Sequence, residues 1–167
     1  MKQILTILAI LCFFSVMAAP ASAFTAESLS INVSENGDAT VTFSYNLGWA
    51  EKIAVFLRIA DPATELKGAL ESNSGKEVSV SEVTTNSASF LINGYAHVDT
   101  GDSEMTYTTP ALSFTRASEI LSDYWFAPLI SVDLSPAETT VIFPDGYTEY
   151  FYDSIEIPKI SHAISLS

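Results

Sequence analysis

The chain has 167 residues, of which 48% are hydrophobic, and it carries 20 acidic against 7 basic side chains for a net charge of −13. A surface this acidic repels phosphate backbones, so the composition argues against nucleic acid as a partner. The hydrophobic content is too high for a disordered chain, and the length suits one domain with a sizeable core.

Residues 1–23 have the pattern of a secretory signal peptide. Lys2 supplies a positive charge, an apolar run extends over Ile4–Met17, and small residues follow at Ala21–Ala23. We expect cleavage between Ala23 and Phe24, and a secreted, extracellular or cell-surface location. The apolar run is shorter than the roughly 20 residues that a membrane-spanning helix needs, so no integral span is expected after cleavage.

Cleavage would leave residues 24–167 as a single β-rich domain of 144 residues with a net charge of −14. It would also remove Cys12, the sole cysteine. The mature chain therefore has no disulfide, no thiolate nucleophile and no cysteine zinc site. We expect no cofactor, with a divalent cation such as calcium considered only at contacts between subunits.

The first segment of the domain predicts a β-hairpin. Leu29, Ile31 and Val33 alternate with polar residues, and a second alternating run follows at residues 40–47. Between the two runs, Asn36-Gly37 is typical of a type I′ turn, which requires positive φ at both residues.

Helical patterns follow this hairpin. Residues 49–60 fit a helix or a strand, with the helix preferred. A clearer helix begins at Asp61-Pro62, where aspartate can cap and proline suits the first helical position, and it ends at Asn73–Gly75.

The remaining segments predict mostly strands. Phe90, Leu91 and Ile92 suggest a strand that is buried on both faces. The expected elements are strands at 78–83, 87–98, 104–109 and 129–134, a short helix at 116–123, a hairpin of 139–143 and 148–152 around Pro144–Tyr147, and an edge strand at 155–157 limited by Pro158. This order predicts a β-dominated α+β fold, with an antiparallel sheet or two-sheet sandwich and one or two short helices inserted after the first hairpin.

One acidic segment invites two chemical interpretations. Asp99-Thr100-Gly101 resembles the triplet of aspartic proteases, but it occurs once and the charged Asp102 follows the glycine, so a polar hairpin turn is favoured. Asp99, Asp102 and Glu104 are the candidate calcium ligands, because carboxylate oxygens suit that cation. Their spacing matches no EF-hand loop.

Other polar candidates are isolated. Asp145 and Glu149 mark a second acidic turn. His97 and His162 lack a second histidine at metal-ligand spacing, so ordinary polar roles are favoured. Asn32 begins an Asn-Val-Ser glycosylation sequon and is expected to face outward from its strand.

Several aromatic residues are candidates for a binding surface. They could form a carbohydrate platform, but core packing and cross-strand pairing are favoured. The residues concerned are Trp49, Trp125, Phe126, Tyr147, Tyr150, Phe151 and Tyr152.

No catalytic motif stands out, so a non-enzymatic role is expected. Several features resemble those of exported archaeal surface proteins, namely the Ala-Ser-Ala cleavage site, the low isoelectric point, the few lysines and the turn Phe143-Pro144-Asp145-Gly146-Tyr147. The whole mature chain is most similar in character to methanogen sheath-type structural subunits. That resemblance implies strands joining into hoops around a cell, and it transfers no functional residue.

The leading hypothesis is therefore a self-associating structural subunit of a sheath-like or filament-like β-rich assembly, built by strand-edge contacts. The alternative is a secreted monomeric module that binds carbohydrate or another surface protein. A secreted hydrolase is the remote third hypothesis.

Overall fold

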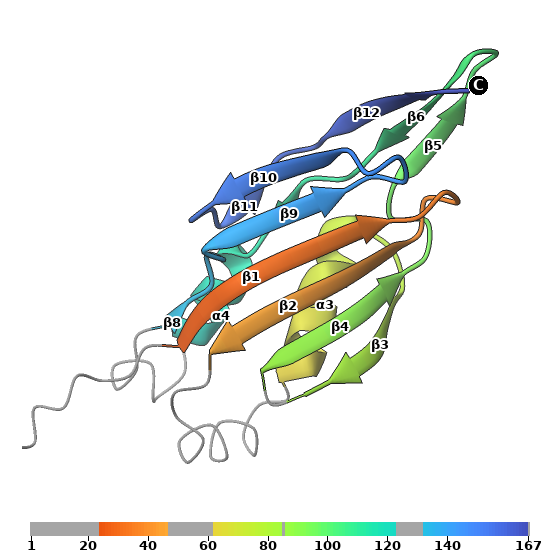
Figure 1. The fold of residues 1–167 in the computed structure, drawn as a ribbon. Coiled ribbons are helices and arrows are strands. Elements are labelled where there is room, and N and C mark those ends of the chain that lie inside the picture. The colour runs from red at the N-terminus through yellow and green to blue at the C-terminus, as the bar shows by residue number, and fades with distance from the viewer. Residues whose placement is uncertain (1–23, 47–61, 85, 123–131, 167) are drawn as a thin grey trace, which may run out of the picture.

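Strands dominate the structure and two helices lie among them in the described part of the chain, which confirms the expected β-dominated α+β class (Figure 1). This computed structural model describes residues 24–46, 62–84, 86–122 and 132–166. In chain order the elements are β1 (Phe24–Val33), β2 (Ala39–Asn46), α3 (Pro62–Ser74), β3 (Val78–Val83), β4 (Ser87–Ile92), β5 (His97–Thr100), β6 (Glu104–Thr108), β7 (Leu112–Ser113), α4 (Thr115–Ser122), β8 (Val132–Asp133), β9 (Glu138–Ile142), β10 (Thr148–Tyr152), β11 (Glu156–Ile157) and β12 (Ser161–Ser165).

The largest layer is a seven-stranded sheet with the order β10-β9-β1-β2-β4-β3, and β8 pairs with the start of β1. β1 pairs antiparallel with β2 but parallel with β8 and β9. The sheet is therefore mixed, and its central strand is paired on one side with segments from the last quarter of the chain.

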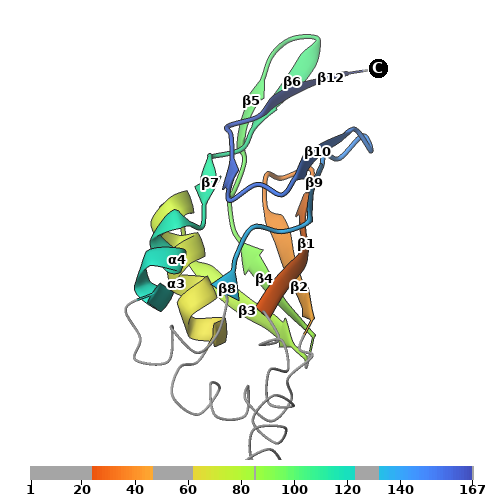
Figure 2. The ribbon, with the colours of Figure 1, turned by 90° about the vertical axis from the view of Figure 1, so that its left-hand side faces the viewer.

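One face of this sheet forms the core. Leu29, Ile31 and Val33 alternate on this face of β1, and their cross-strand partners on β2 and β4 are also buried. Both helices lie on this side (Figure 2), and Leu70 of α3 is buried in the same cluster. Period-two alternation on the strands and one apolar stripe on the helix thus meet in a single layer of side chains.

The opposite face, here called the outer face, is polar. Three rows of side chains cross it through Ser28, Ser30 and Asn32 of β1, and no described helix lies over them (Figures 1 and 2). In these rows the charged residues are Glu82 and Glu138. Serine or threonine occupies ten positions, which are Ser28, Ser30, Thr40, Thr42, Ser44, Ser79, Ser87, Ser89, Thr140 and Thr148.

A separate three-stranded sheet, ordered β12-β6-β5, packs at one end of the large sheet. The Tyr107 hydroxyl of β6 donates a hydrogen bond of 2.9 Å to the Glu35 carbonyl in the β1–β2 turn. β11 pairs only with β7, so Pro158 follows a two-stranded edge, as expected.

The β1–β2 turn differs from the predicted type I′ turn. The Gly37 N–H bonds to the Ser34 carbonyl at 2.9 Å and the Ser34 N–H bonds to the Asp38 carbonyl at 2.8 Å. Gly37 has a φ of +82°, whereas Asp153 is the only non-glycine residue with positive φ in the described ranges. The loop is therefore a three-residue turn with glycine last, and Asn36 instead accepts the Asp38 N–H.

The β9–β10 turn repeats this geometry. The Gly146 N–H bonds to the Phe143 carbonyl at 2.9 Å and the Phe143 N–H to the Tyr147 carbonyl at 2.8 Å. Gly146 has a φ of +87°, and Asp145 accepts the Tyr147 N–H as Asn36 accepts that of Asp38. The predicted tight turn at Pro144–Tyr147 is confirmed.

The single strand predicted at 87–98 is wrong. β4 ends at Ile92, and Gly94 turns the chain with a φ of +60° before β5 begins in the other sheet. The expected burial on both faces also fails, because Leu91 is 40% exposed on the outer face.

Two helix predictions are confirmed, namely the helix from Pro62 to the Asn73–Gly75 region and the short helix expected at 116–123, which is observed as Thr115–Ser122. The polar turn expected at 99–103 is shorter, because Asp99 and Thr100 belong to β5 and only residues 101–103 lie between β5 and β6. The segments 49–60 and 124–128 lie outside the described residues, as does the first half of the strand expected at 129–134, whose second half contains β8. None of the described helices has the length and hydrophobicity to cross a membrane.

Replacing Gly37 should destabilise the fold more than replacing Gly146. A Cβ atom at Gly37 would lie 2.5 Å from the Ala96 carbonyl oxygen, whereas one at Gly146 would meet nothing within 4 Å. Gly146→Ala should cost about 1–2 kcal/mol, the cost of a left-handed conformation, and Gly37→Ala should cost clearly more. Urea unfolding of both variants measures the difference, and equal losses would contradict this account of the Gly37 contact.

Thr139→Val should stabilise the protein. Thr139 is fully buried on β9, and its hydroxyl has no hydrogen-bond partner in the described structure. Valine has nearly the same shape without the unsatisfied hydroxyl, so we expect a gain of about 1 kcal/mol in unfolding free energy. Thr140→Val, on the outer face, is the control and should change stability by less than about 0.5 kcal/mol. A loss of stability in Thr139→Val would show that the hydroxyl is satisfied.

Candidate functional site

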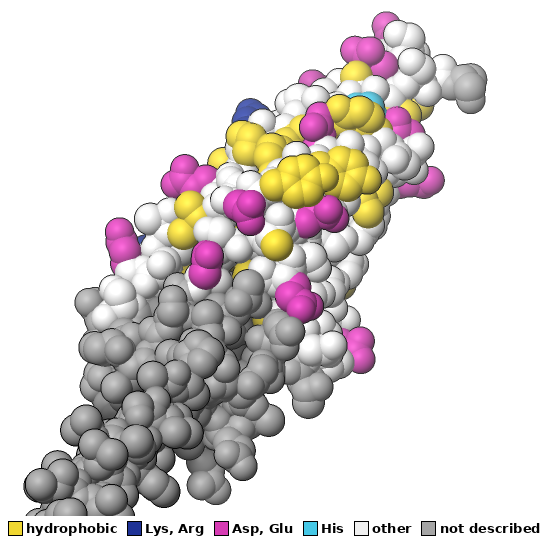
Figure 3. Space-filling view, turned by 60° about the vertical axis from the view of Figure 1, so that its left-hand side comes forward, with side chains coloured by type: hydrophobic (Ala, Val, Ile, Leu, Met, Phe, Trp, Pro, Cys, Tyr) yellow, Lys and Arg dark blue, Asp and Glu magenta, His cyan; other side chains and the backbone are white. Residues whose placement is uncertain are grey.

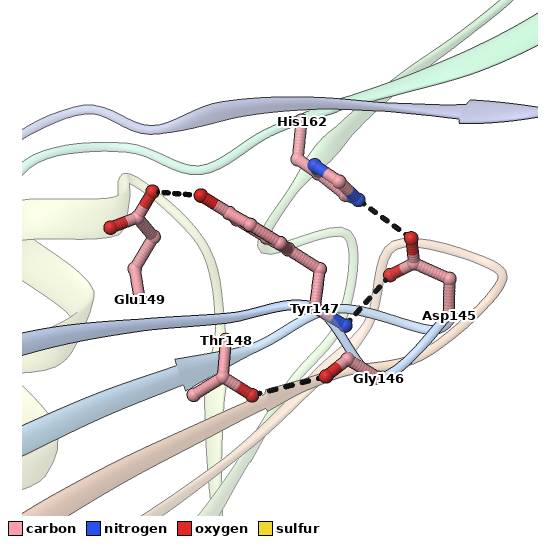
Figure 4. Close-up of polar contacts among 6 residues, drawn as sticks. All are labelled: Asp145, Gly146, Tyr147, Thr148, Glu149 and His162. Carbon is pink, nitrogen blue, oxygen red and sulfur yellow. Dashed lines mark hydrogen bonds and ion pairs between the residues drawn. The ribbon is translucent and has the colours of Figure 1, made fainter.

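The β9–β10 turn joins the large sheet to β12 through hydrogen bonds (Figure 4). The Asp145 carboxylate accepts the Tyr147 N–H through Oδ1 at 3.0 Å, and its Oδ2 lies 2.8 Å from Nε2 of His162. The Tyr147 hydroxyl donates to Glu149. We call Asp145, Tyr147, Glu149 and His162 the tyrosine–histidine cluster.

Ring contacts strengthen the same connection. The Tyr147 and His162 rings stack with centroids 4.2 Å apart and planes 8° from parallel. The buried Phe143 ring lies 5.0 Å from His162 and 6.1 Å from Tyr147. Sequence reasoning placed Asp145 and Glu149 in an acidic turn but missed their connection to His162, because β12 was not predicted.

The electrostatics of the cluster follow from these contacts. The hydrogen bond from His162, helped by the Tyr147 N–H, lowers the pKa of Asp145 below its ordinary value. The hydrogen bond to Glu149 raises the pKa of Tyr147. Each side chain of the cluster contacts at least one other member, so the arrangement connects the β9–β10 hairpin of the large sheet to β12.

Next to the cluster, β10 presents Tyr150 and Tyr152 on the outer face. Their side chains are 53% and 63% exposed. Their cross-strand neighbours are Thr140 and Glu138, but the aromatic contact runs along the strand, where the two rings lie 6.5 Å apart with planes 6° from parallel. Phe151 points to the core side and is half-buried, as core packing predicts.

The candidate calcium ligands lie around the β5–β6 turn of the three-stranded sheet and not on β10. Asp99 is on β5, Glu104 begins β6, and Asp102 is in the turn between them, which the Gly101 N–H closes on the Glu104 carbonyl at 2.9 Å. All three carboxylates are exposed. Within the described ranges no three histidine, cysteine or acidic side chains are placed to hold a metal ion, and calcium binding stays a prediction.

The other predicted residues are scattered. His97 is exposed at the start of β5. Asn32 is exposed on the outer face as expected, where its side-chain amide donates to the Ser30 hydroxyl at 3.1 Å, and its glycosylation stays a prediction. Phe24 begins β1, whereas Ala23 and the aromatic residues Trp49, Trp125 and Phe126 lie outside the described residues.

No family model, curated protein or solved structure matches this chain. The surfaces of the described residues are therefore the basis for assigning a function.

The pKa of Asp145 should depend on His162. Its lowered folded-state pKa contributes stability above the ordinary value of 3.8, and this contribution is lost as the pH falls through the lowered value. An NMR titration of the Asp145 carboxyl carbon should give a midpoint below 3.8 that rises in His162→Ala. Ser165→Ala, an exposed change on the same strand, should leave the midpoint in place. An unchanged midpoint in His162→Ala would contradict the assignment.

Proposed function

We propose that the protein is a non-enzymatic structural subunit of an extracellular or cell-surface β-rich assembly, in which copies join through the edge of β10. The observation that supports this proposal is the unpaired edge of that strand. In the described structure β10 pairs with β9 alone and forms one end of the large sheet.

The hydrogen-bond pattern identifies which backbone groups are free. The Phe143 N–H bonds to the Tyr147 carbonyl, and at the other end the Asp153 N–H bonds to the Ala137 carbonyl. Bonded and non-bonded pairs alternate in an antiparallel ladder, so Glu149 and Phe151 bond to β9. The N–H and C=O groups of Thr148, Tyr150 and Tyr152 consequently point away from the sheet.

This edge lacks most of the features that prevent strand addition, and Glu149 is its only charged residue. Residues 148–152 contain no proline, lysine or bulge, and their register with β9 is continuous. By contrast, the opposite edge strand β3 is interrupted by a register shift between Val80 and Glu82. Figure 3 shows the β10 side, where apolar side chains gather among separate carboxylates.

Two copies of β10 are compatible in an antiparallel register centred on Tyr150. The two Tyr150 residues would exchange both backbone hydrogen bonds, and Thr148 of each copy would do so with Tyr152 of the other. Glu149 would then lie opposite Phe151 of the other copy, so like charges do not face each other directly. The pairing would double the width of the sheet without a new fold.

The net charge should make this association depend on ions. At the net charge of −14 expected for the mature chain, two copies repel each other at low ionic strength, and salt or divalent cations reduce that repulsion. We therefore expect assembly to increase with salt and with calcium, including when no dedicated calcium site is present.

Tyr150→Pro tests the edge directly. Proline removes an N–H that points away from β9, so it should leave the internal ladder intact while removing one donor from the interface. In sedimentation velocity with calcium and salt, the unmodified mature protein should form a concentration-dependent dimer and Tyr150→Pro should be monomeric.

Tyr150→Ala is the matched control, because it removes the ring but keeps the N–H, and it should still assemble. If Tyr150→Pro disturbs the fold, as seen by circular dichroism, Tyr152→Lys provides a second test by placing a hydrated charge on the edge. A mature protein that stays monomeric under all conditions, or a folded Tyr150→Pro that assembles normally, would refute the proposal.

A further inference from the structure

The outer face has an unusual composition for so acidic a chain. The protein carries 20 acidic residues, yet the three rows that cross this face contain only Glu82 and Glu138, at separate positions, and no lysine or arginine. Hydroxyl side chains fill most of the remaining positions. A surface of this kind can exchange hydrogen bonds with a neutral polar ligand. It offers few groups of opposite charge to a strongly charged ligand.

Tyr150 and Tyr152 add an aromatic platform at one side of this face. Their rings are nearly parallel, lie 6.5 Å apart, and are more than half exposed. Neither ring is part of the core, so more than half of each side chain remains available for contact. The C–H groups of a sugar ring are the natural complement to such faces, because a sugar has an apolar side and a hydroxyl rim.

Polar groups lie next to the rings in the position that a sugar's hydroxyls require. Glu138 is the cross-strand partner of Tyr152, and Thr140 is that of Tyr150. The Thr140 hydroxyl donates to a Glu138 oxygen at 3.4 Å, which leaves the other carboxylate oxygen free to accept from a ligand. Ser28 and Ser30 follow in the same two rows on β1.

From this arrangement we infer that the outer face binds a neutral polysaccharide, with sugar rings on Tyr150 and Tyr152 and sugar hydroxyls bonded to Glu138 and the adjacent hydroxyl rows. The neutral class follows from the near absence of charge, and a polymer follows from the continuation of the hydroxyl rows across the sheet. This binding is separate from the proposed edge pairing, which uses backbone groups of β10.

Affinity electrophoresis with matched polymers tests this inference. The mature protein should be retarded in gels that contain a neutral polysaccharide, with hydroxyethyl cellulose, soluble chitin oligomers and mannan as the probes. Carboxymethyl cellulose, which has the same backbone as the first probe but carries carboxylates, should retard it much less. The double variant Tyr150→Ala/Tyr152→Ala should bind at least about tenfold more weakly, since both stacking contacts are lost.

Two further variants separate the ring contacts from other effects. Tyr147→Ala removes an exposed tyrosine that belongs to the tyrosine–histidine cluster, and it should retain binding. Glu138→Gln should weaken binding while keeping both rings. Circular dichroism of each variant confirms that the fold is intact.

Failure of this inference can be distinguished from failure of the assembly proposal. Thr148→Pro removes an edge N–H but keeps both rings, so it should lose assembly and retain binding to soluble oligosaccharides. The inference is overturned if none of the neutral probes binds, if the double tyrosine variant binds as well as the unmodified protein, or if the anionic polymer binds equally well.

Discussion

Two hairpin turns with the same backbone geometry connect the large sheet to the three-stranded sheet. Each is a three-residue loop that ends in a glycine with positive φ, Gly37 in one and Gly146 in the other. In the first turn the Gly37 carbonyl accepts a hydrogen bond from the Ala96 N–H at 2.8 Å, and in the second the Asp145 carboxylate lies within hydrogen-bond distance of His162. Ala96 directly precedes β5 and His162 lies on β12, so both turns help to position the three-stranded sheet.

This constraint also orients β10. The tyrosine–histidine cluster holds Tyr147, the first residue after the Gly146 turn, against β12, and from there β10 continues with one edge that no described strand pairs. The rings of Tyr150 and Tyr152 consequently face the outer side, while Phe151 faces the core. Edge pairing would use the backbone groups of β10, whereas sugar binding would use the side chains of Tyr150 and Tyr152 on the same strand.

Much of the fold could be predicted because the local signals were consistent. Pro62 began a helix that ended near Gly75, and period-two alternation identified most strands. The Asn36 turn was misjudged because Asn-Gly also fits a three-residue loop in which only the glycine has positive φ. No local sequence pattern predicts the parallel pairing of β1 with β9, because it depends on how two segments far apart in the chain pack together.

The candidate surfaces were only partly predictable for a related reason. The sequence identified Tyr150 and Tyr152 as members of an aromatic group, but their exposure follows from β10 being an edge strand. His162 could not be assigned a partner, because the alternation of β12 rests on two half-buried residues, His162 and Ile164. The exposure of the two tyrosines and the partner of His162 both depend on contacts between distant segments. The periodicity of a sequence gives information only about residues that are close together in the chain.

The position of β1 has a consequence for how the protein folds. β1 is the first described strand, and Leu29 on it is paired with Thr139 on β9. Such pairing over a long sequence separation is slow to form, because the closure of a large loop precedes the contacts that stabilise it. During synthesis, one edge of the central strand therefore remains open until nearly the whole chain is available. If the chain is exported as its sequence predicts, this delay would favour passage in an unfolded state and completion of the sheet only on the far side.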